Sequence, residues 1–313
     1  MSALERVVPT HAPAHIRGET GTGKELIARA LHARGPRADK AFVVHNCAGF
    51  TDSLLQSALF GHKKGAFTGA DTDRIGMFQA ADGGTLFLDE VAELTPQAQA
   101  ALLRALQYGE IVPVGSTQSI TVDVRVISAT HKDLRQLSVE GGFRADLLYR
   151  LLVLIIDLPP LREREDDIAL LAMHFLDDAN ARYGRQVAGF SDFAMRAIER
   201  YGWPGNVREL GSEIARAVLA GKDGESLTTA HLSPELRAAS ELPPAHLGAT
   251  TATSRPIVIS SAMGYDAAVE QLEKSLVERA LRKSKGVVAR AADLLDMDRS
   301  RLAKLRRRLG FRD

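Results

Sequence analysis

The chain has 313 residues, of which 45% are hydrophobic and 25% charged, with a formal net charge of +1, so it has ample material for a core. Its single cysteine, Cys47, excludes an intrachain disulfide and fits a reducing cytoplasm. The longest apolar run, Leu151 to Ile156, is far too short for a membrane span, and no apolar signal-peptide stretch opens the chain, so we expect a cytoplasmic protein without a membrane partner.

Short apolar runs alternate with helical patterns over the first half of the chain. This alternation predicts a parallel sheet flanked by helices. The expected strands are 14–17, 42–45, 85–88, 124–128 and 153–157. The run Leu158-Pro159-Pro160 then ends the alternation.

A glycine-rich segment follows the first expected strand and opens a helix. In a phosphate-binding loop, glycines let backbone N–H groups surround the phosphates, and Lys24 adds a positive charge. Glu25 stands where Ser or Thr usually binds Mg²⁺, so a structural glycine-rich turn is the alternative at this point. The candidate nucleotide-binding residues are Gly18, Glu19, Thr20, Gly21, Thr22, Gly23, Lys24 and Glu25.

Two carboxylates end the third expected strand. Asp89 at the strand tip is placed to hold Mg²⁺ through water, and Glu90 to polarise the attacking water. A lone Asp-Glu pair is also common as an acidic helix start after a strand. The upstream lysine loop favours the nucleotide site.

A loop of small residues between these two motifs has little use in ATP chemistry itself. It consists of Gly65, Ala66, Phe67, Thr68, Gly69 and Ala70. The two glycines tolerate positive φ and can act as hinges, while Phe67 offers an apolar anchor and Thr68 a hydrogen-bonding group. We therefore predict a contact with a partner outside the nucleotide site; the alternative is an inert hairpin turn.

Three arginines together are candidates for the chemistry, although each alone is more typical of an ordinary surface ion pair. Arg144 and Arg150 lie close to the last expected strand, where arginines from a neighbouring subunit can stabilise the charge of phosphoryl transfer. Arg208 falls in the helical region that follows. There it is placed to sense the nucleotide and couple it to movement of that region.

The second half of the chain is helical. Residues 166–220 are helical in pattern, with Ser191 and Pro204 as expected helix starts, whereas residues 238–262 resemble a flexible linker. The expected domains are an N-terminally short α/β nucleotide-binding subdomain at 1–160, a helical lid at 161–237, a linker at 238–263 and a DNA-binding domain at 264–313.

The C-terminal end is basic. From Lys283 to Asp313 there are ten Lys/Arg against four Asp/Glu, an excess of six, and 288–295 and 299–309 read as helix, turn and helix. Asp298 can cap the second helix. We expect Arg299, Ser300, Arg301 and Lys304 near base edges and Arg306, Arg307 and Arg308 on phosphates. A dimer formed through 266–282 would favour inverted-repeat sites in double-stranded DNA; a basic hairpin that contacts protein is the alternative.

Six segments together resemble one family. They are GETGTGKE at 18–25, LFGHKKGAFTGA at 59–70, GGTLFLDE at 83–90, FRADLLYRL at 143–151, LPPLRERE at 158–165 and WPGNVREL at 203–210. The chain resembles the AAA+ module of bacterial enhancer-binding proteins, the activators of sigma-54 RNA polymerase, joined to a Fis-type domain. The resemblance implies an α/β AAA+ P-loop NTPase with a parallel sheet and helical lid, followed by an all-α Fis-type helix-turn-helix domain.

The resemblance also implies roles for residues. Lys24 and the loop glycines would bind the phosphates of ATP. Asp89 would serve Mg²⁺, and Glu90 would activate the attacking water. Asn46 matches an asparagine that holds the catalytic glutamate until the partner is engaged, and Thr130 and His131 match the first sensor position. Arg144 and Arg150 match the arginine fingers that act in trans, and Arg208 matches the second sensor. Phe67 and Thr68 match the loop tip that touches sigma-54. A homo-oligomer between a dimer and a hexameric ring is implied.

The chain departs from the family pattern at a few positions. Lys63 replaces the usual acid, Gln56 and Ala58 stand where Glu is common, and Gly211-Ser212 replaces Glu-Asn, so the ion pairs beside the 65–70 loop should differ. Only thirteen residues precede Ala14, so we expect an AAA+ domain that is short at its N-terminus. Two alternative functions are a non-hydrolysing DNA-binding regulator and an AAA+ protein that acts on another partner.

Overall fold

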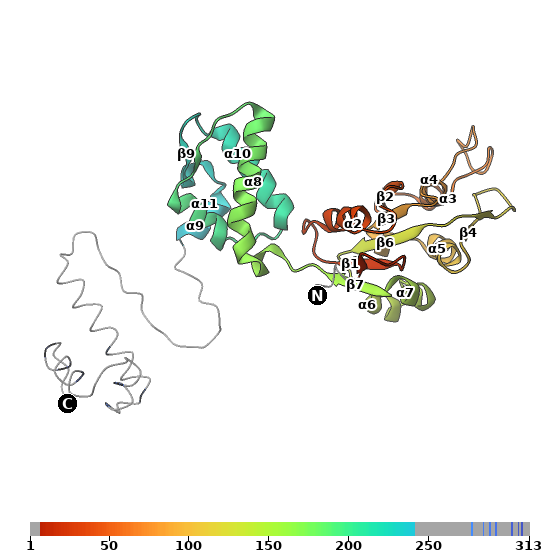
Figure 1. The fold of residues 1–313 in the computed structure, drawn as a ribbon, viewed down its shortest axis with the longest axis horizontal. Helices are drawn as coiled ribbons and strands as arrows, with labels where there is room; N and C mark the ends of the chain where they lie inside the picture. The colour runs from red at the N-terminus through yellow and green to blue at the C-terminus, as the bar shows by residue number, and fades with distance from the viewer. Residues whose placement is uncertain are drawn as a thin grey trace. The chain divides into compact units, whose positions relative to one another are not determined.

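The computed structural model of the chain describes residues 7–241 and seven single positions near the C-terminus, which are 277, 284, 288, 292, 302, 306 and 308. The internal contacts divide the chain into two compact units, Met1–Ala245 and His246–Asp313. The first unit contains the sheet and the helical region, and the fold below is that of this unit (Figure 1). The expected DNA contacts at Arg299, Ser300, Arg301, Lys304 and Arg307 lie outside the described residues; Arg306 and Arg308 are described as single helical positions.

The centre of the first unit is a five-stranded sheet in the order β2-β3-β6-β1-β7. All four pairs of neighbouring strands run parallel. The strands are β1 Ala14–Arg17, β2 Phe42–Asn46, β3 Thr85–Asp89, β6 Arg125–Thr130 and β7 Leu154–Asp157. The inner strands β3 and β6 are buried along their length apart from Asp89, because helices cover both faces of a parallel sheet.

Two apolar cores fill the two faces of this sheet. On one face Leu86 and Leu88 of β3 pack with Leu55 and Leu102. On the other face Phe87 packs with Leu31 of α2. The alternation of side chains along β3 thus sends successive residues into different cores. The helices of this subdomain are α2 Lys24–Ala33, α3 Asp52–Phe60, α4 Met77–Ala80, α5 Pro96–Tyr108, α6 Leu134–Val139 and α7 Ala145–Leu151.

The helical region from residue 161 onward has its own core. Its helices are α8 Glu165–Tyr183, α9 Asp192–Arg200, α10 Asn206–Ala220 and α11 Pro234–Glu241. Trp203 lies fully buried at the centre, and its Nε1 donates a hydrogen bond to the carbonyl oxygen of Ile198 at 2.8 Å. We call this region the lid. Among the described residues, no helix has both the length and the apolar character to cross a membrane.

The five strands predicted from apolar runs are confirmed to within two residues at each end. Ser191 also caps α9 as expected, since its Oγ accepts a hydrogen bond from the backbone N of Ala194. The prediction of a purely helical lid was incomplete, because β8 Gly189–Phe190 pairs with β9 Ser226–Leu227. Two-residue strands carry no periodicity, so a pattern search cannot find them.

Two further two-residue strands, β4 Glu110–Ile111 and β5 Ile120–Thr121, form an antiparallel pair. Figure 1 shows the loop that joins them beside the loop between α3 and α4. A backbone hydrogen bond from the N of Lys63 to the carbonyl oxygen of Val114, at 3.0 Å, connects these two loops. The segment expected to contact a partner is therefore braced by a second loop.

Candidate nucleotide site

The glycine-rich loop connects β1 to α2, as the sequence predicts. Gly21 and Gly23 have φ of +82° and +96°, a backbone region that residues other than glycine rarely adopt. The Thr22 hydroxyl donates to the carbonyl oxygen of Glu19 at 2.8 Å and closes the loop on itself. Backbone N–H groups of such a loop, at the start of a helix, form an anion site.

Lys24 and Glu90 meet at the carboxyl ends of β1 and β3. The Lys24 Nζ lies 4.0 Å from Glu90 Oε1 and donates to the carbonyl oxygens of Gly18 and Glu19 at 3.0 and 3.1 Å. The lysine is buried, with 7% of its side chain exposed. The two motifs recognised separately in the sequence thus form one site.

Glu90 is held by the residues at the end of β6. Its Oε2 accepts hydrogen bonds from Thr130 Oγ1 at 3.1 Å and from His131 Nδ1 at 2.9 Å. Burial acts to raise the pKa of Glu90, but the bonds from His131 and Thr130 and the charge of Lys24 outweigh it and lower the pKa. Glu90 also has φ of +50°, a strained conformation for a residue with a side chain and one that clusters at functional sites.

Asp89 and Cys47 lie beside this glutamate. Burial and the neighbouring Glu90 charge raise the pKa of Asp89, whose Oδ1 accepts from the backbone N of Glu90 at 3.0 Å. Burial, with the charges of Asp89 and Glu90, raises the pKa of the Cys47 thiol to about 12. No cluster of three or more His, Cys, Asp or Glu that could hold a metal occurs in the described part of the chain. Two adjacent carboxylates with hard oxygen atoms suit Mg²⁺ that arrives with a nucleotide, because this ion is usually held by one or two carboxylates plus substrate phosphates.

Two predicted residues have other contacts in the structure. Asn46 pairs in register with Asp89, but its Oδ1 accepts from the backbone N of Ala48 at 2.8 Å. Glu25 forms an exposed ion pair with Arg29 at 2.7 Å, one helical turn along α2. The hydrogen bonds on the Glu90 carboxylate come from Thr130 and His131.

The three candidate arginines occupy different surfaces. Arg144 precedes α7 and forms a two-bond pair with Asp146, at 3.0 and 2.7 Å, while Arg150 is exposed in the last turn of that helix. Arg208 lies in the first turn of α10, and its backbone N donates to the carbonyl oxygen of Gly21 at 3.3 Å. Among the described residues, no hydrogen bond or ion pair connects Arg144 or Arg150 to Lys24 or Glu90.

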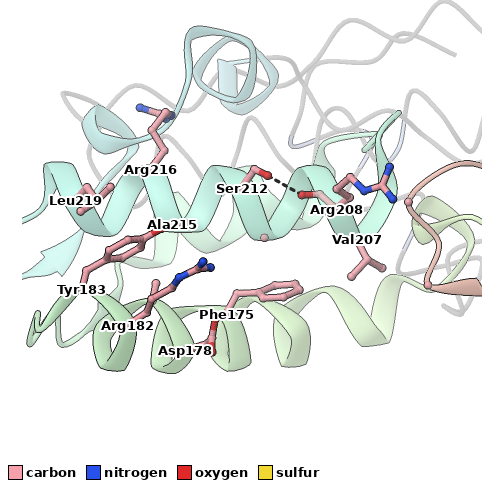
Figure 2. A pocket seen from close by; sticks show the side chains of 14 residues that line it. Phe175, Asp178, Arg182, Tyr183, Val207, Arg208, Ser212, Ala215, Arg216 and Leu219 are labelled. Carbon is pink, nitrogen blue, oxygen red and sulfur yellow. Dashed lines mark hydrogen bonds between the residues drawn. The ribbon is translucent and has the colours of Figure 1, made fainter. Parts of the chain in front are cut away.

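A groove of about 680 Å³ runs between α8 and α10 and reaches the glycine-rich loop at Gly21 and Gly23. Figure 2 shows Phe175 and Arg182 on α8 facing the α10 side of this groove. Val207 and Arg208 form its α10 side at the loop end. Of the groove residues, the sequence identified Gly21, Gly23 and Arg208 but no residue of α8, because the groove depends on two helices that pack side by side.

The 65–70 segment forms a turn in the loop between α3 and α4. The backbone N of Gly65 donates to the carbonyl oxygen of Ala70 at 2.8 Å, and Thr68 is exposed. The expected positive φ is confirmed, at +81° for Gly65 and +94° for Gly69, where an added Cβ would meet no atom within 4 Å. Backbone conformation, not space, therefore requires these glycines.

Residues before and after this turn hold it in place. The ring of Phe67 is half-buried with its centroid 5.0 Å from that of His62, in an edge arrangement. His62 is buried, and its Nδ1 lies 2.6 Å from Ser57 Oγ. Lys63 Nζ pairs with Asp73 Oδ2 at 2.7 Å, while Asp73 Oδ1 accepts from the backbone N of Lys64 at 2.8 Å. Lys63, which stands where the family usually has an acid, thus forms an ion pair with Asp73.

Comparison with known families gives three consecutive matches. The family of the sigma-54 interaction domain matches residues 1–157, the AAA+ ATPase lid domain matches 162–247, and the bacterial regulatory proteins of the Fis family match 268–309. The first match covers half of the chain. These matches and the parallel sheet confirm the predicted fold class, an α/β AAA+ P-loop NTPase with a lid and a C-terminal Fis-type domain.

Individual relatives agree with this assignment. The transcriptional regulatory protein ZraR of Escherichia coli K12 is 46% identical over 308 residues, which cover 98% of this chain and 66% of ZraR. The nitric oxide reductase transcription regulator NorR1 of Cupriavidus necator is 47% identical over 315 residues, with 98% and 61% covered. The crystal structure of NtrX from Brucella abortus in complex with ATP has a TM-score of 0.67 at 31% identity, with 98% and 66% covered.

The chain therefore spans roughly two thirds of the length of these relatives. The order of its three family matches is that of one protein class, and the relatives are regulators of transcription. The chain belongs to the family of sigma-54-dependent bacterial enhancer-binding proteins.

Proposed function

We propose that this protein hydrolyses ATP and uses the energy to remodel the closed promoter complex of sigma-54 RNA polymerase. The observation that carries the proposal is the meeting of Lys24 with Glu90, 4.0 Å apart, beside a glycine-rich loop. A lysine charge, an anion-binding loop and an ionised carboxylate are the parts that phosphoryl transfer to water needs.

The roles of these residues follow from their positions. Lys24 and the loop N–H groups bind the phosphates of ATP. Glu90 accepts a proton from the attacking water, and its lowered pKa keeps it ionised for that step. Asp89 would hold Mg²⁺ through water, and the ion, when bound, would supply positive charge that neutralises the phosphate oxygens. Thr130 and His131 fix the Glu90 carboxylate, and Asn46 is a second candidate for holding it.

The groove explains how the rest of the nucleotide is bound. Val207 and Phe175 line this groove and would offer apolar surface to the base, and Arg208, at the loop end, would contact the terminal phosphate. The similar NtrX was crystallised with ATP, which supports nucleotide binding by this fold. Arg144, just before α7, and Arg150, in its last turn, are exposed and act on the site of a neighbouring subunit, so the active form is a homo-oligomer, with a hexameric ring as the proposed size.

The 65–70 turn is the contact for sigma-54. Thr68 is exposed at its tip and Phe67 is half-buried against His62, so a modest change of the turn would release the aromatic ring. A turn with two positions in ATP-bound and hydrolysed states would have two affinities for its partner. The Fis-type domain binds double-stranded upstream DNA, and the setting is the bacterial cytoplasm.

The ATPase rate, measured per subunit against protein concentration, tests the enzymatic part. If Arg144 and Arg150 act in trans, this rate should rise steeply with concentration and then level off as rings form. Glu90→Gln should bind ATP yet hydrolyse it at least 100-fold more slowly, in keeping with the roughly 10²- to 10⁴-fold contribution of a general base. A background rate at all concentrations would instead support a non-hydrolysing DNA-binding regulator.

Partner binding is tested separately. Purified protein with an ATP transition-state mimic should shift sigma-54 on a native gel. Thr68→Ala should keep the ATPase rate and lose both this shift and transcription activation, while Thr117→Ala, in the β4–β5 loop, is the matched control. Loss of hydrolysis and activation together in Thr68→Ala would mean that the turn is structural.

A further inference from the structure

Three sequence motifs meet at one point beside the nucleotide site. Glu19 lies in the glycine-rich loop, Arg162 lies in the 3₁₀ helix η2 Leu161–Glu163 of the lid, and Asn206 begins α10. Arg162 and Asn206 are 143 and 187 positions away from Glu19 in the sequence. The proposed chemistry leaves all three side chains without a role of their own, so their meeting calls for an explanation.

Their geometry is that of a bidentate ion pair supported by an amide. Arg162 Nη2 and Nη1 donate to Glu19 Oε1 and Oε2 at 2.7 and 2.9 Å. Asn206 Nδ2 donates to the same Oε2 at 3.1 Å and to the carbonyl oxygen of Thr20 at 3.0 Å. Its Oδ1 accepts from the backbone N of Leu161 at 2.8 Å. Parallel N–H···O bonds of this kind fix direction as well as distance.

Asn206 is fully buried, and its side chain binds the loop on one side and the lid on the other. Its φ of +52° is one that asparagine tolerates better than most side chains. A Cβ added to Gly21 would lie 2.2 Å from the carbonyl oxygen of Gly205. The turn before α10 therefore rests directly on the glycine-rich loop.

The charge of Glu19 is otherwise unfavourable here. A loop that binds phosphates gains nothing from a carboxylate, because like charges repel. The hydrogen bonds from Arg162 and Asn206 lower the pKa of Glu19 to about 2, so it remains ionised at neutral pH. The guanidinium of Arg162 compensates that charge, and the pair joins the loop to the lid.

We propose that Glu19, Arg162 and Asn206 form a clamp that holds the lid on the phosphate-binding loop and thereby aims Arg208 at the terminal phosphate of ATP. Arg208 follows Asn206 by two residues, and its backbone N is bound to Gly21. The three are positioning residues, and their effect on turnover rests on the proposed ATP hydrolysis. ADP uses the loop without Arg208, so the clamp favours ATP over ADP.

The test compares Arg162→Ala, Glu19→Gln and Arg162→Lys with Arg104→Ala. Arg104 forms an equally exposed ion pair with Glu110 at 3.0 Å, far from the loop, and serves as the control. Affinities for fluorescent ADP and for a non-hydrolysable ATP analogue are measured without turnover, followed by kcat and the thermal midpoint. Arg162 is 46% exposed, so its replacement should leave folding intact.

We expect Arg162→Ala to lower ATP-analogue affinity and kcat about tenfold each, the size of one lost charge-assisted bond. ADP affinity should fall less than ATP-analogue affinity, since both nucleotides meet the uncompensated Glu19 charge but only the ATP analogue also loses the aim of Arg208. Arg162→Lys should have an intermediate ATP-analogue affinity and kcat, because lysine keeps the positive charge but cannot form the two parallel hydrogen bonds of the guanidinium. The double variant Glu19→Gln/Arg162→Ala should be no worse than Arg162→Ala alone, because both changes remove one interaction.

Three results would overturn the clamp. They are an unchanged ratio of ATP-analogue to ADP affinity in Arg162→Ala, an equal loss of both affinities with a lower thermal midpoint, and additive effects in the double variant. A wild-type protein without ATPase activity would instead contradict the proposed function. The affinity ratio would still decide on the clamp, because it needs no hydrolysis.

Discussion

At the scale of single residues, the environment of Glu90 decides what the site can do. The backbone of Glu90 has a strained φ, and its carboxylate is partly buried and accepts hydrogen bonds from Thr130 and His131. Burial alone would favour the neutral acid, which cannot accept a proton from water. The two hydrogen bonds reverse that preference. Thr130 and His131 therefore favour the ionised form of the proposed base as well as fixing its orientation.

The pH dependence of ATPase activity tests this setting. His131→Ala removes the donor that most strongly lowers the pKa of Glu90, so that pKa should rise and the acid limb of the kcat profile should move to higher pH. Lys132→Gln, which breaks an exposed pair with Glu93, should leave the limb in place. A lower kcat with an unmoved limb would show that His131 acts only on geometry.

His15 predicts a second pH effect, on stability. This residue of β1 is buried beside Ser128, and burial followed by the charge of Arg17 lowers its pKa from 6.5 to about 4. Between these two pH values His15 is protonated in the unfolded chain but not in the folded chain. The free energy of unfolding therefore falls as the pH drops from 6.5 to 4, by up to about 3 kcal/mol.

Denaturant unfolding at pH 7, 5.5 and 4.5 measures this slope. His15→Gln keeps a polar partner for Ser128 and removes the titration, so its slope should be shallower than that of the wild type. Some slope should persist, because burial also lowers the pKa of His32 and of His45. His174→Gln, at an exposed position of α8, is the control; equal slopes for both variants would contradict the assignment.

At the scale of elements, the sequence predicted the sheet well and the lid contacts poorly. Apolar runs between turn residues mark the strands, and Lys24 and Asp89-Glu90 stand at strand ends that a parallel sheet brings together. The groove depends on the packing of α8 against α10, and the bonds from Arg162 and Asn206 to Glu19 join residues more than 140 positions apart. Local patterns carry no signal for such contacts.

The Lys63–Asp73 pair gives a prediction for the loop element. This pair is exposed, so breaking it should leave thermal unfolding unchanged. Asp73→Asn should nevertheless speed hydrogen exchange of residues 63–73, because the Lys64 N–H loses a charged acceptor. Transcription activation should fall with it.

Reversal of both charges, in Lys63→Asp/Asp73→Lys, should restore activation more than exchange protection, since lysine cannot accept the Lys64 bond. Lys40→Gln, at an exposed pair with Asp39, is the control for a changed surface charge. Normal activation in Asp73→Asn would show that the turn needs no ion pair at its base.

At the scale of the whole molecule, the residues proposed for the chemistry lie on separate surfaces of the described chain. The residues proposed for binding and proton transfer lie together. Arg144, just before α7, and Arg150, in its last turn, are exposed and have no intrachain bond to Lys24 or Glu90 among the described residues. Within the described residues, β2 and β7 are the edge strands of the sheet. A head-to-tail contact joins two different surfaces, and it gives a ring when the rotation between neighbouring subunits closes.

Mixing two inactive variants tests this division. Glu90→Gln subunits lack the base but carry the arginines, and Arg144→Ala/Arg150→Ala subunits have the reverse defect. In a mixed ring, an intact base faces intact arginines at some interfaces, so the mixture should regain a clear fraction of wild-type ATPase activity. A mixture as inactive as its components, at concentrations where wild type is active, would place the arginines in cis.

Cys47 has a practical consequence for following the 65–70 turn. It is the only cysteine of the chain, it is buried, and its pKa of about 12 leaves almost no thiolate at neutral pH. The native protein is therefore nearly inert to thiol-directed labels. A cysteine placed at exposed Asp71 would take up a spin label or fluorophore alone, and the motion of the turn during turnover can be recorded without first removing a native thiol.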